Sequence, residues 1–319
     1  MSKSDYNEAM EDQVGEKFGD NFRSGFVAVL GRPNVGKSTL INALMRQKIA
    51  AVSPRPQTTR KRQMGILSLE NAQVIFVDTP GVHQARHKLG ENMNQEAIST
   101  LEECDLILFL VDASHPPAPE DDLLADLLRQ VNRPVPLILV LNKTDLVEGE
   151  KLAKHRAAFT GLLPEYGRNT PIVVEVSAVT GSGLELLLTE ILSHLPEGAP
   201  FFPEDQVTDL YERDLAADLI REAALHLLKE EVPHGIAIRI DQFTERNQSG
   251  AYIEATVFVE RESHKAIVIG ENGSMIKEIG SAARREIEAM SGRKVYLRLR
   301  VKVRKNWRDD EKVLRWFGF

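Results

Sequence analysis

The N-terminal part of the chain alternates short apolar runs with segments of helical periodicity. The apolar runs, rich in Val, Ile and Leu, cover 26–31, 74–78, 105–112, 135–142 and 171–177. The helical patterns cover 37–44, 88–103, 121–130, 151–163 and 183–195. Runs of this length that are apolar throughout are typical of parallel strands buried on both faces. The alternation predicts an α/β domain with a doubly wound, mostly parallel sheet, which binds ligands at the C-terminal ends of its strands.

The C-terminal part follows a different pattern. Residues 235–243 and 251–260 alternate apolar and polar positions, as half-exposed antiparallel strands do. A helical pattern at 209–230 precedes them, and a helix, loop, helix and strand follow between 263 and 307. The order α-β-β-α-α-β predicts a second, α+β domain.

A proline-rich segment separates the two patterns. Residues 195–206 contain three prolines and two phenylalanines, and proline interrupts helical structure. We therefore predict a semi-rigid linker here. The expected organisation is a flexible N-terminal extension at 1–23, a first domain at 24–196, a linker at 197–207 and a second domain at 208–319.

Charge distinguishes the end of the chain from the rest. The 319 residues carry a formal net charge of −7, whereas residues 263–319 contain 14 basic and 7 acidic side chains. This asymmetry favours a polyanionic partner for the second domain.

Composition points to a globular protein of the cytosol. The longest apolar run, 106–111, is too short to cross a membrane, and the polar N-terminus lacks the apolar core of a secretion signal. The single cysteine, Cys104, allows no internal disulfide. We expect Cys104 to be a small residue of the hydrophobic core.

The first apolar run leads directly into GRPNVGKS, which matches the motif G-x-x-x-x-G-K-[ST] between a strand and a helix. Its glycines let backbone amides surround phosphates, and the following helix N-terminus attracts anions. Lys37 adds a positive charge, and the Ser38 hydroxyl can bind Mg²⁺. The expected phosphate-binding residues are Gly31, Arg32, Pro33, Asn34, Val35, Gly36, Lys37 and Ser38.

A second motif, DTPG, begins at the end of the run 74–78. Asp78 is placed to hold Mg²⁺ through water, and the amide of Gly81 to meet a terminal phosphate. Thr79 and Pro80 complete this part of the expected nucleotide site.

A third motif, NKTD, predicts which base is bound. It comprises Asn142, Lys143, Thr144 and Asp145 at the end of the run 135–142. The Asp145 carboxylate can accept both the N1–H and N2–H donors of guanine, which adenine lacks, and sites of this kind discriminate by roughly 10⁴ to 10⁵. The backbone amides of Ser177 and Ala178, at the next strand end, would complete the base pocket.

In this order the motifs resemble those of the translation-factor-related class of GTPases. The resemblance implies that 53–62 is the first switch loop, with Thr58 or Thr59 binding Mg²⁺ and the γ-phosphate. The sequence does not choose between the two threonines. The implied catalytic residues are Lys37, Thr58, Thr59, Asp78 and Gly81, and the implied metal ligands are Ser38, Thr58, Thr59 and Asp78.

One position departs from Ras-like enzymes. Val82 stands where a water-positioning glutamine often follows the Asp-x-x-Gly motif. An apolar side chain cannot orient water, so we expect slow intrinsic hydrolysis. In relatives with an apolar residue here, the asparagine that corresponds to Asn34 is linked to a K⁺ ion, and the resemblance implies the same for this chain.

The second domain contains another glycine-framed loop, Gly270, Glu271, Asn272 and Gly273. No G-K-[ST] follows it and no strand precedes it, so it is not a nucleotide loop. It resembles the GXXG loop of type II KH domains, which clamps about four nucleotides of a single strand. The expected RNA-binding residues are Lys265, Gly270, Glu271, Asn272, Gly273, Lys277, Arg284, Lys302, Arg304 and Lys305.

Some features of this domain leave alternatives open. KH loops usually contain a basic residue, whereas Glu271 would repel a phosphate; Lys265, Lys277, Arg284 and Arg285 are the cations that would compensate. Trp307 and Trp316 are either stacking platforms for bases or part of the domain's own core. The same choice applies to Ile267, Ile269 and Ile276 as the floor of an RNA groove.

A GTPase domain, a proline-rich linker and a type II KH domain together resemble the Era family of bacterial GTPases over residues 24–319. The stretches FPEDQVTD and EEVPH carry part of this resemblance. It implies a protein that hydrolyses GTP, binds the 3′ end of 16S rRNA on the 30S subunit, acts in assembly of that subunit and associates peripherally with the inner membrane. We also expect a monomer, although the sequence does not determine the oligomeric state.

Two other functions remain open from the sequence. The chain could be chiefly an RNA-binding placeholder whose hydrolysis only times its release. It could also be a P-loop kinase or ATPase in which the Asn-Lys-x-Asp motif is accidental.

Overall fold

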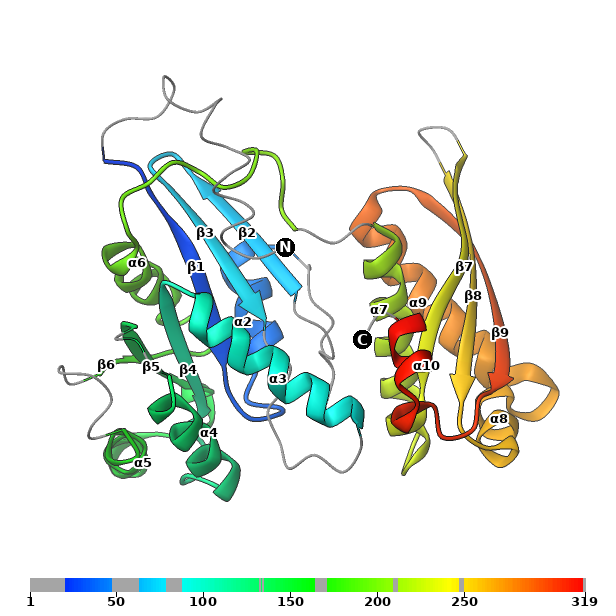
Figure 1. The fold of residues 1–319 in the computed structure, drawn as a ribbon, viewed down its shortest axis with the longest axis horizontal. Helices are drawn as coiled ribbons and strands as arrows, with labels where there is room; N and C mark the ends of the chain where they lie inside the picture. Colours follow the sequence, from blue (N-terminus) through cyan, green and yellow to red (C-terminus); the bar gives the residue numbers. More distant parts are fainter. Residues whose placement is uncertain are drawn as a thin grey trace. The chain divides into compact units, whose positions relative to one another are not determined.

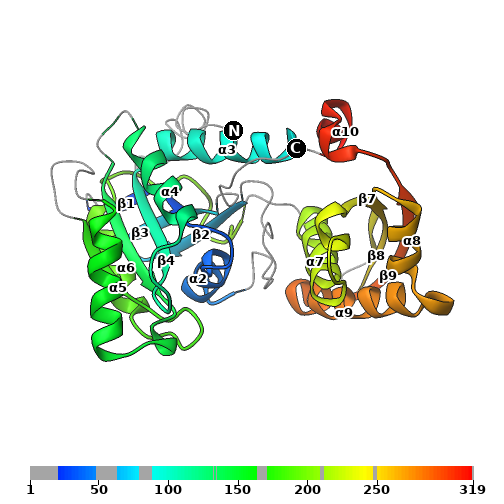
Figure 2. The same cartoon turned by 90° about the horizontal axis from the view of Figure 1, so that it is seen from below.

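The computed structural model describes residues 21–47, 63–78, 88–131, 133, 135–163, 171–208, 212–246 and 250–317. The chain divides into two compact units. The first contains most of the described residues up to 208, and the second contains those from 212 onward. Each unit is a β-sheet covered by helices (Figures 1 and 2).

The first unit is built on a six-stranded sheet in the order β2-β3-β1-β4-β5-β6 (Figure 1). Only β2 runs antiparallel to its neighbour; the other strand pairs are parallel. This confirms the predicted doubly wound, mostly parallel sheet. The strands are β1 (Arg23–Leu30), β2 (Gln63–Leu69), β3 (Ala72–Asp78), β4 (Leu106–Asp112), β5 (Leu137–Asn142) and β6 (Ile172–Glu175).

Helices cover both faces of this sheet, as its apolar strands require. One hydrophobic cluster joins the sheet to α2 (Lys37–Met45) and α6 (Leu184–His194). The cluster on the other face joins it to α3 (Lys88–Glu103), α4 (Pro119–Arg129) and α5 (Gly149–Gly161). The strands therefore end at an edge of the sheet that lies between two layers of helices.

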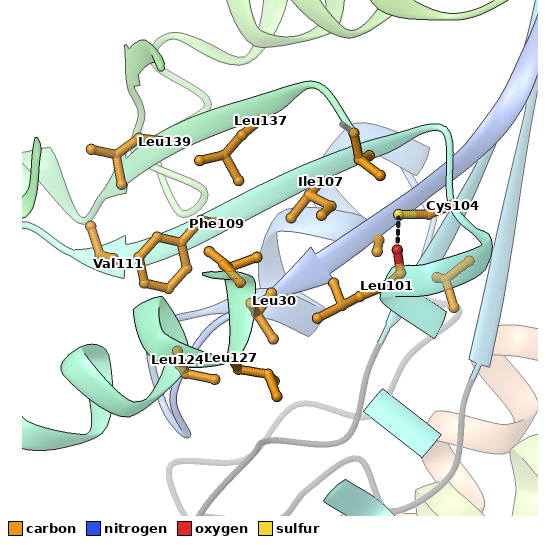
Figure 3. Packing of buried hydrophobic residues seen from close by; sticks show 14 of the residues in the cluster. Leu30, Leu101, Cys104, Ile107, Phe109, Val111, Leu124, Leu127, Leu137 and Leu139 are labelled. Carbon is orange, nitrogen blue, oxygen red and sulfur yellow. Dashed lines mark hydrogen bonds between the residues drawn. The ribbon is translucent and has the colours of Figure 1, made fainter. Parts of the chain in front are cut away.

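Cys104 belongs to the second of these clusters (Figure 3). Its side chain is 1% exposed, and its Sγ donates to the carbonyl oxygen of Leu101 at 3.4 Å. Burial raises the pKa of the thiol to about 12. The prediction that Cys104 is a small core residue is confirmed.

The segment 197–208, which we call the connecting segment, is bound to the first unit. Buried Gln73 accepts through Oε1 from the amides of Phe201 at 2.8 Å and Phe202 at 3.0 Å. Its Nε2 donates to the carbonyl of Phe202 at 2.9 Å. Farther along, the Thr208 hydroxyl donates to the carbonyl of Met64 in β2 at 2.7 Å. Hydrogen bonds to β2 and β3 thus hold the proline-rich stretch against the sheet.

The second unit contains a three-stranded sheet in the order β7-β8-β9. The strands are β7 (Ala237–Arg246), β8 (Gly250–Val259) and β9 (Lys294–Val303), and the helices are α7 (Glu212–Leu227), α8 (Glu262–Ile269) and α9 (Ser274–Ser291). Strands β7 and β8 are antiparallel, and β9 runs parallel to β8. One apolar cluster joins the three helices to the sheet. The predicted order α-β-β-α-α-β is confirmed.

A short helix that we did not predict, α10 (Glu311–Trp316), follows β9. Trp307, just before it, is 0% exposed, and its Nε1 donates to the carbonyl of Gly235 at 2.9 Å. The interpretation of Trp307 as a stacking platform is therefore wrong, because the ring lies in the core. Trp316 is 50% exposed and packs edge-on against Phe258, with ring centroids 5.5 Å apart.

Among the residues described in both units, no helix combines the length and the apolar character needed to traverse a bilayer.

Candidate functional site

The loop of residues 31–36 joins β1 to the N-terminus of α2. At Gly36 the backbone has a φ of 103°, and an added Cβ would stand 2.5 Å from Nδ2 of Asn142. At Gly31 an added Cβ would stand 2.4 Å from the carbonyl oxygen of Leu110. Glycine is required at both positions by these close approaches. The loop therefore lies against the C-terminal ends of β4 and β5, where ligands were expected.

Lys37, Ser38 and Asp78 come together beside this loop. The buried ammonium of Lys37 donates to the carbonyl of Gly31 at 2.8 Å. Burial lowers the pKa of Lys37, and the negative charge of Asp78 opposes this effect. The Ser38 hydroxyl donates to Oδ2 of Asp78, at the end of β3, at 2.9 Å. Adjacent hydroxyl and carboxylate oxygens are ligands that Mg²⁺ prefers, so these residues fit a magnesium ion beside a phosphate.

Asn142 ties the third motif to two other loops. Its Nδ2 donates to the carbonyl of Val35 at 2.8 Å, and its Oδ1 accepts from the amide of Ala178 at 3.0 Å. Ser177, which precedes Ala178, is buried, and its Oγ accepts from the amide of Thr180 at 3.2 Å. The Asn142 side chain, at the end of β5, thus connects the phosphate-binding loop 31–38, which we call the P-loop, with the loop that follows β6.

Asp145 lies in a 3-10 turn, Thr144–Leu146, directly after β5. Its side chain is exposed. Asp145 thus follows β5 at the edge of the sheet that also carries the phosphate loop. This position is compatible with the predicted recognition of a guanine edge.

The sequence interpretation missed Asp112, at the end of β4. Its Oδ2 accepts from Nζ of Lys143 at 2.7 Å, and its Oδ1 accepts from the amide of Ser114 at 3.0 Å. Burial would raise the pKa of Asp112, but the hydrogen bonds from Lys143 and Ser114 outweigh it and lower the pKa. The signal was available, since Asp112 is a polar residue that ends a buried strand.

The P-loop is also connected to α4. Nε of Arg32 donates to Oδ2 of Asp121 at 3.2 Å, and the same carboxylate oxygen accepts from the amide of Ala118 at 2.9 Å. Asp121 is 0% exposed, and its burial raises its pKa despite the nearby guanidinium. The side chain of Arg32 is therefore held by a neighbouring helix. Of the other predicted loop residues, Pro33 and Asn34 lie in the turn that follows Arg32.

Several predicted site residues lie outside the described part of the chain. They are Thr58, Thr59, Thr79, Pro80 and Gly81, together with Val82 and the switch loop 53–62.

The glycine-framed loop of the second unit joins α8 to α9. Gly270 has φ 72° and ψ 173°, a conformation that is essentially restricted to glycine. Gly273 has φ 76° and ψ 18° and precedes the first residue of α9. Between them, Glu271 and Asn272 are exposed. The amides of Gly273 and Ser274 donate to the carbonyls of Gly270 and Glu271 within the loop, so its exposed part consists of Glu271 and Asn272.

The predicted RNA-binding cations are distributed over three elements of this unit. Lys265 lies on α8, where it pairs with Glu262 at 3.8 Å. Lys277 and Arg284 are exposed on α9, and Lys302, Arg304 and Lys305 are exposed at and beyond the end of β9. Of the three isoleucines, Ile267 is 49% exposed, whereas Ile269 and Ile276 are partly buried. The structure thus favours a place in the RNA groove over a place in the core only for Ile267.

Comparisons with known proteins agree with both units. A family model described as a 50S ribosome-binding GTPase matches residues 26–143, and a KH domain model matches residues 231–308. GTPase Era of Caldanaerobacter subterraneus subsp. tengcongensis is 46% identical over 299 residues, which is 93% of this chain and 98% of the relative. GTPase Era of Geobacter metallireducens is 44% identical over 299 residues, again 93% and 98% of the two chains.

Two solved structures have the same fold over nearly the whole chain. One is a crystal structure of Era in complex with MgGDPNP and nucleotides 1506–1542 of 16S ribosomal RNA. It is 40% identical, has a TM-score of 0.86 and covers 93% of this chain and 99% of its own. The other is an Aquifex aeolicus Era variant bound to GDP·AlF4⁻, 39% identical with a TM-score of 0.86 and the same coverage. The chain belongs to the Era family and is a GTPase with a C-terminal KH domain.

Proposed function

We propose that this GTPase is a nucleotide-controlled switch that binds the 3′ end of 16S rRNA through its KH domain and acts in assembly of the 30S subunit. The observation that carries the nucleotide half is the set of hydrogen bonds from Asn142 and Lys143 to the P-loop. The observation that supports the RNA half is the exposed loop between α8 and α9. A relative with the same fold was crystallised with 16S rRNA nucleotides 1506–1542.

In the proposed nucleotide site, Asp145 accepts the two donors of the guanine edge. The amides of the loop 31–36 and the N-terminus of α2 surround the phosphates. Lys37 exchanges its hydrogen bond with the carbonyl of Gly31 for one with a phosphate oxygen. An anion at this position stabilises the buried ammonium, so nucleotide binding raises the lowered pKa of Lys37.

Ser38 and Asp78 would hold Mg²⁺ at the phosphates. The ion supplies charge neutralisation for the γ-phosphate when it is bound. Thr58 or Thr59 adds a ligand from the switch loop, and the Gly81 amide contacts the γ-phosphate. Because Val82 cannot orient water, we propose slow intrinsic hydrolysis, with a K⁺ ion beside Asn34 that contributes positive charge.

In the proposed RNA site, the backbone of Gly270 to Gly273 approaches the phosphates of about four nucleotides. Lys265, Lys277 and Arg284 supply the positive charge that the loop itself lacks. Peripheral binding to the inner membrane remains a prediction from the family resemblance, and a monomeric state remains a prediction.

The test is calorimetry of the full chain with GTP, GDP and ATP, and with a single strand copied from the 3′ end of 16S rRNA. We expect GTP and GDP to bind at least about 10³-fold more tightly than ATP, since the carboxylate of Asp145 is unpaired with adenine. Asp145→Asn should remove most of this preference. Replacement of K⁺ by Na⁺ should slow single-turnover hydrolysis. Retained ATP turnover with unchanged base choice in Asp145→Asn would instead support a kinase or ATPase.

A further inference from the structure

The two faces of the second sheet differ in what covers them. Strand β9 alternates between the faces along its whole length. On the inner face, Cδ1 of Leu299 lies 3.5 Å from the position of a Cβ added to Gly280 of α9. The side chains on either side of Leu299 therefore point away from the helices. The exposed residues of β9 on this outer face are Lys294, Tyr296, Arg298, Arg300 and Lys302.

An aromatic pair marks one end of the outer face. Tyr252 of β8 lies directly opposite Tyr296 of β9 in the parallel register. Their rings stack with centroids 5.5 Å apart and an interplanar angle of 9°. Tyr296 is 65% exposed. Within the described residues β9 is an edge strand, so no strand lies beyond the ring face that Tyr296 turns away from Tyr252.

Two arginines next to this pair are oriented by one carboxylate. Glu254 forms ion pairs with Arg298 at 4.0 Å and with Arg300. The Tyr252 hydroxyl donates to Glu254 Oε2 at 3.4 Å, which links the aromatic pair to the arginines. The Glu254 side chain is only 12% exposed, whereas those of Arg298 and Arg300 are 55% and 47% exposed. Both guanidinium groups therefore remain accessible to solvent while they pair with this carboxylate.

The charge of this face is positive. Four cations on β9 face one carboxylate, Glu254, on β8. On β7, Asp241 is shared by Arg239 and by the hydroxyl of Thr256, which donates at 2.5 Å. The other end of the face is covered, since Phe258 packs against Trp316 and Phe317. The uncovered part of the described surface thus combines a stacked aromatic ring with a row of cations.

We propose that this outer face, defined by Tyr252, Tyr296, Arg298, Arg300 and Lys302, is a second binding surface for single-stranded RNA. A base stacks on the free face of Tyr296, and the three cations contact successive phosphates. Aromatic platforms beside cationic grooves bind single strands without strict sequence preference.

This inference rests on the proposed RNA-binding function and extends it. The loop between α8 and α9 holds one stretch of the strand, and the outer face of the sheet holds another. A short RNA fills only the loop, whereas a longer one reaches both surfaces.

The test compares two fluorescent single-stranded RNAs from the 3′ end of 16S rRNA with the full-length protein. One has about 8 nucleotides, enough for the clamp of about four, and the other has about 30, which exceeds one such surface. The variants are Tyr296→Ala, Tyr296→Phe and the double substitution Arg298→Gln with Arg300→Gln. Lys154→Gln, at a 71% exposed lysine of the first unit, is the control for loss of charge. Tryptophan fluorescence checks the fold of the second unit, which holds both tryptophans.

For the longer RNA we expect Tyr296→Ala to weaken binding about tenfold and Tyr296→Phe to retain it, because the ring makes the contact. The double arginine variant should reduce the slope of log K against log salt by about 1.4, since each phosphate contact contributes about 0.7. The Tyr296 and double arginine variants should bind the shorter RNA as tightly as the unaltered protein does. The Lys154→Gln control should bind both RNAs as tightly as the unaltered protein does.

Suppose that the unaltered protein binds the longer RNA and that Tyr296→Ala and the double variant show the same affinity and salt slope. That result would overturn this inference but not the proposed function. The same variants can be tested with vesicles that contain anionic lipid. If they lost binding to these vesicles and kept their affinity for RNA, the inference would also be overturned and the face would be assigned to a membrane. Failure of the unaltered protein to bind either RNA would overturn the proposed function as well.

Discussion

The ammonium group of Lys143 lies 2.7 Å from Oδ2 of Asp112 and 2.8 Å from the carbonyl oxygen of Asn34. One lysine of the base-recognition motif therefore joins the ends of β4 and β5 to the phosphate loop. The residues proposed to recognise the base and those proposed to bind the phosphates therefore belong to one hydrogen-bonded unit. A change at Asp112, which would not itself touch nucleotide, is expected to affect both.

Asp112→Asn should weaken GTP and GDP binding about tenfold, because Lys143 loses the charge that holds it and a charged hydrogen bond contributes about 1.5–3 kcal/mol. Isothermal calorimetry measures the loss. Asp126→Asn is a matched control, since Asp126 is 61% exposed and pairs with Arg129 on its own helix. Equal nucleotide affinity in the two variants would contradict this role of Asp112.

The same carboxylate predicts a pH dependence of stability. Because Lys143 and Ser114 outweigh burial and hold the pKa of Asp112 below its ordinary range in the folded protein, the unfolded chain binds its proton first as pH falls. The contribution of Asp112 is fully present above about pH 5 and is lost as pH falls through the folded pKa. The difference in unfolding free energy between the unaltered protein and Asp112→Asn should therefore be constant from about pH 5 to 8 and shrink below about pH 4. Urea unfolding at several pH values checks this, and a difference that grows in acid would be the opposite of the expected sign.

Gln73→Ala should destabilise the first unit by about 3 kcal/mol, because it leaves the two amides and one carbonyl of Phe201 and Phe202 without their buried partner. Gln206→Ala, which removes one partly buried hydrogen bond to the Thr208 carbonyl, should cost about 0.5–1 kcal/mol. Chemical denaturation followed by circular dichroism compares the two. Similar small losses in both would show that the connecting segment is not held by Gln73.

The two glycines of the loop between α8 and α9 should tolerate alanine differently. A Cβ at Gly270 would stand 2.7 Å from the amide nitrogen of Met275, whereas at Gly273 the nearest atom is 4.0 Å away. Gly273→Ala should cost about 1 kcal/mol for its left-handed backbone, and Gly270→Ala about 3 kcal/mol. Denaturation followed by tryptophan fluorescence reports on this unit. An equal cost at both positions would mean that the close contact is relieved by movement of the loop.

Glu271→Gln should strengthen RNA binding about two- to fivefold at low salt, because it removes a negative charge from the centre of the proposed clamp. Glu271→Lys should strengthen it further and steepen the salt dependence by about 0.7. Glu204→Gln provides the same change of charge at an exposed site in the connecting segment. RNA affinity that responds equally to Glu204→Gln and Glu271→Gln would show only an effect of net charge.

Much of the fold and of the nucleotide site could be predicted because their signals are local in sequence. Apolar runs and helical spacing determine where strands and helices form, and the glycine spacing in 31–38 reflects the demands of one loop. The antiparallel edge strand β2 does not alter the predicted architecture of the first unit, and the short helix α10 does not alter that of the second. The observed ends of helices and strands differ from the predicted ends by only a few residues, because capping and packing determine where each element stops.

What could not be predicted depends on contacts between distant residues. The bond from Lys143 to Asp112 exists because β4 and β5 are neighbours in register. Trp307 lies in the core because it reaches the carbonyl of Gly235, 72 positions away. The Tyr252–Tyr296 pair likewise requires the register of β8 with β9. A sequence pattern shows that such residues are polar or aromatic, but their partners come from tertiary structure.

The central claim is that nucleotide state controls RNA binding, and the most direct test is the RNA dissociation constant measured with a GTP analogue, with GDP and without nucleotide. We predict that the GTP-analogue and GDP values differ by at least about fivefold, the lower end of usual coupling between sites. By thermodynamic reciprocity, RNA should change the ratio of GTP-analogue to GDP affinity by the same factor. Equal RNA affinity in all three states would contradict the claim and favour an RNA-binding placeholder whose hydrolysis only times release.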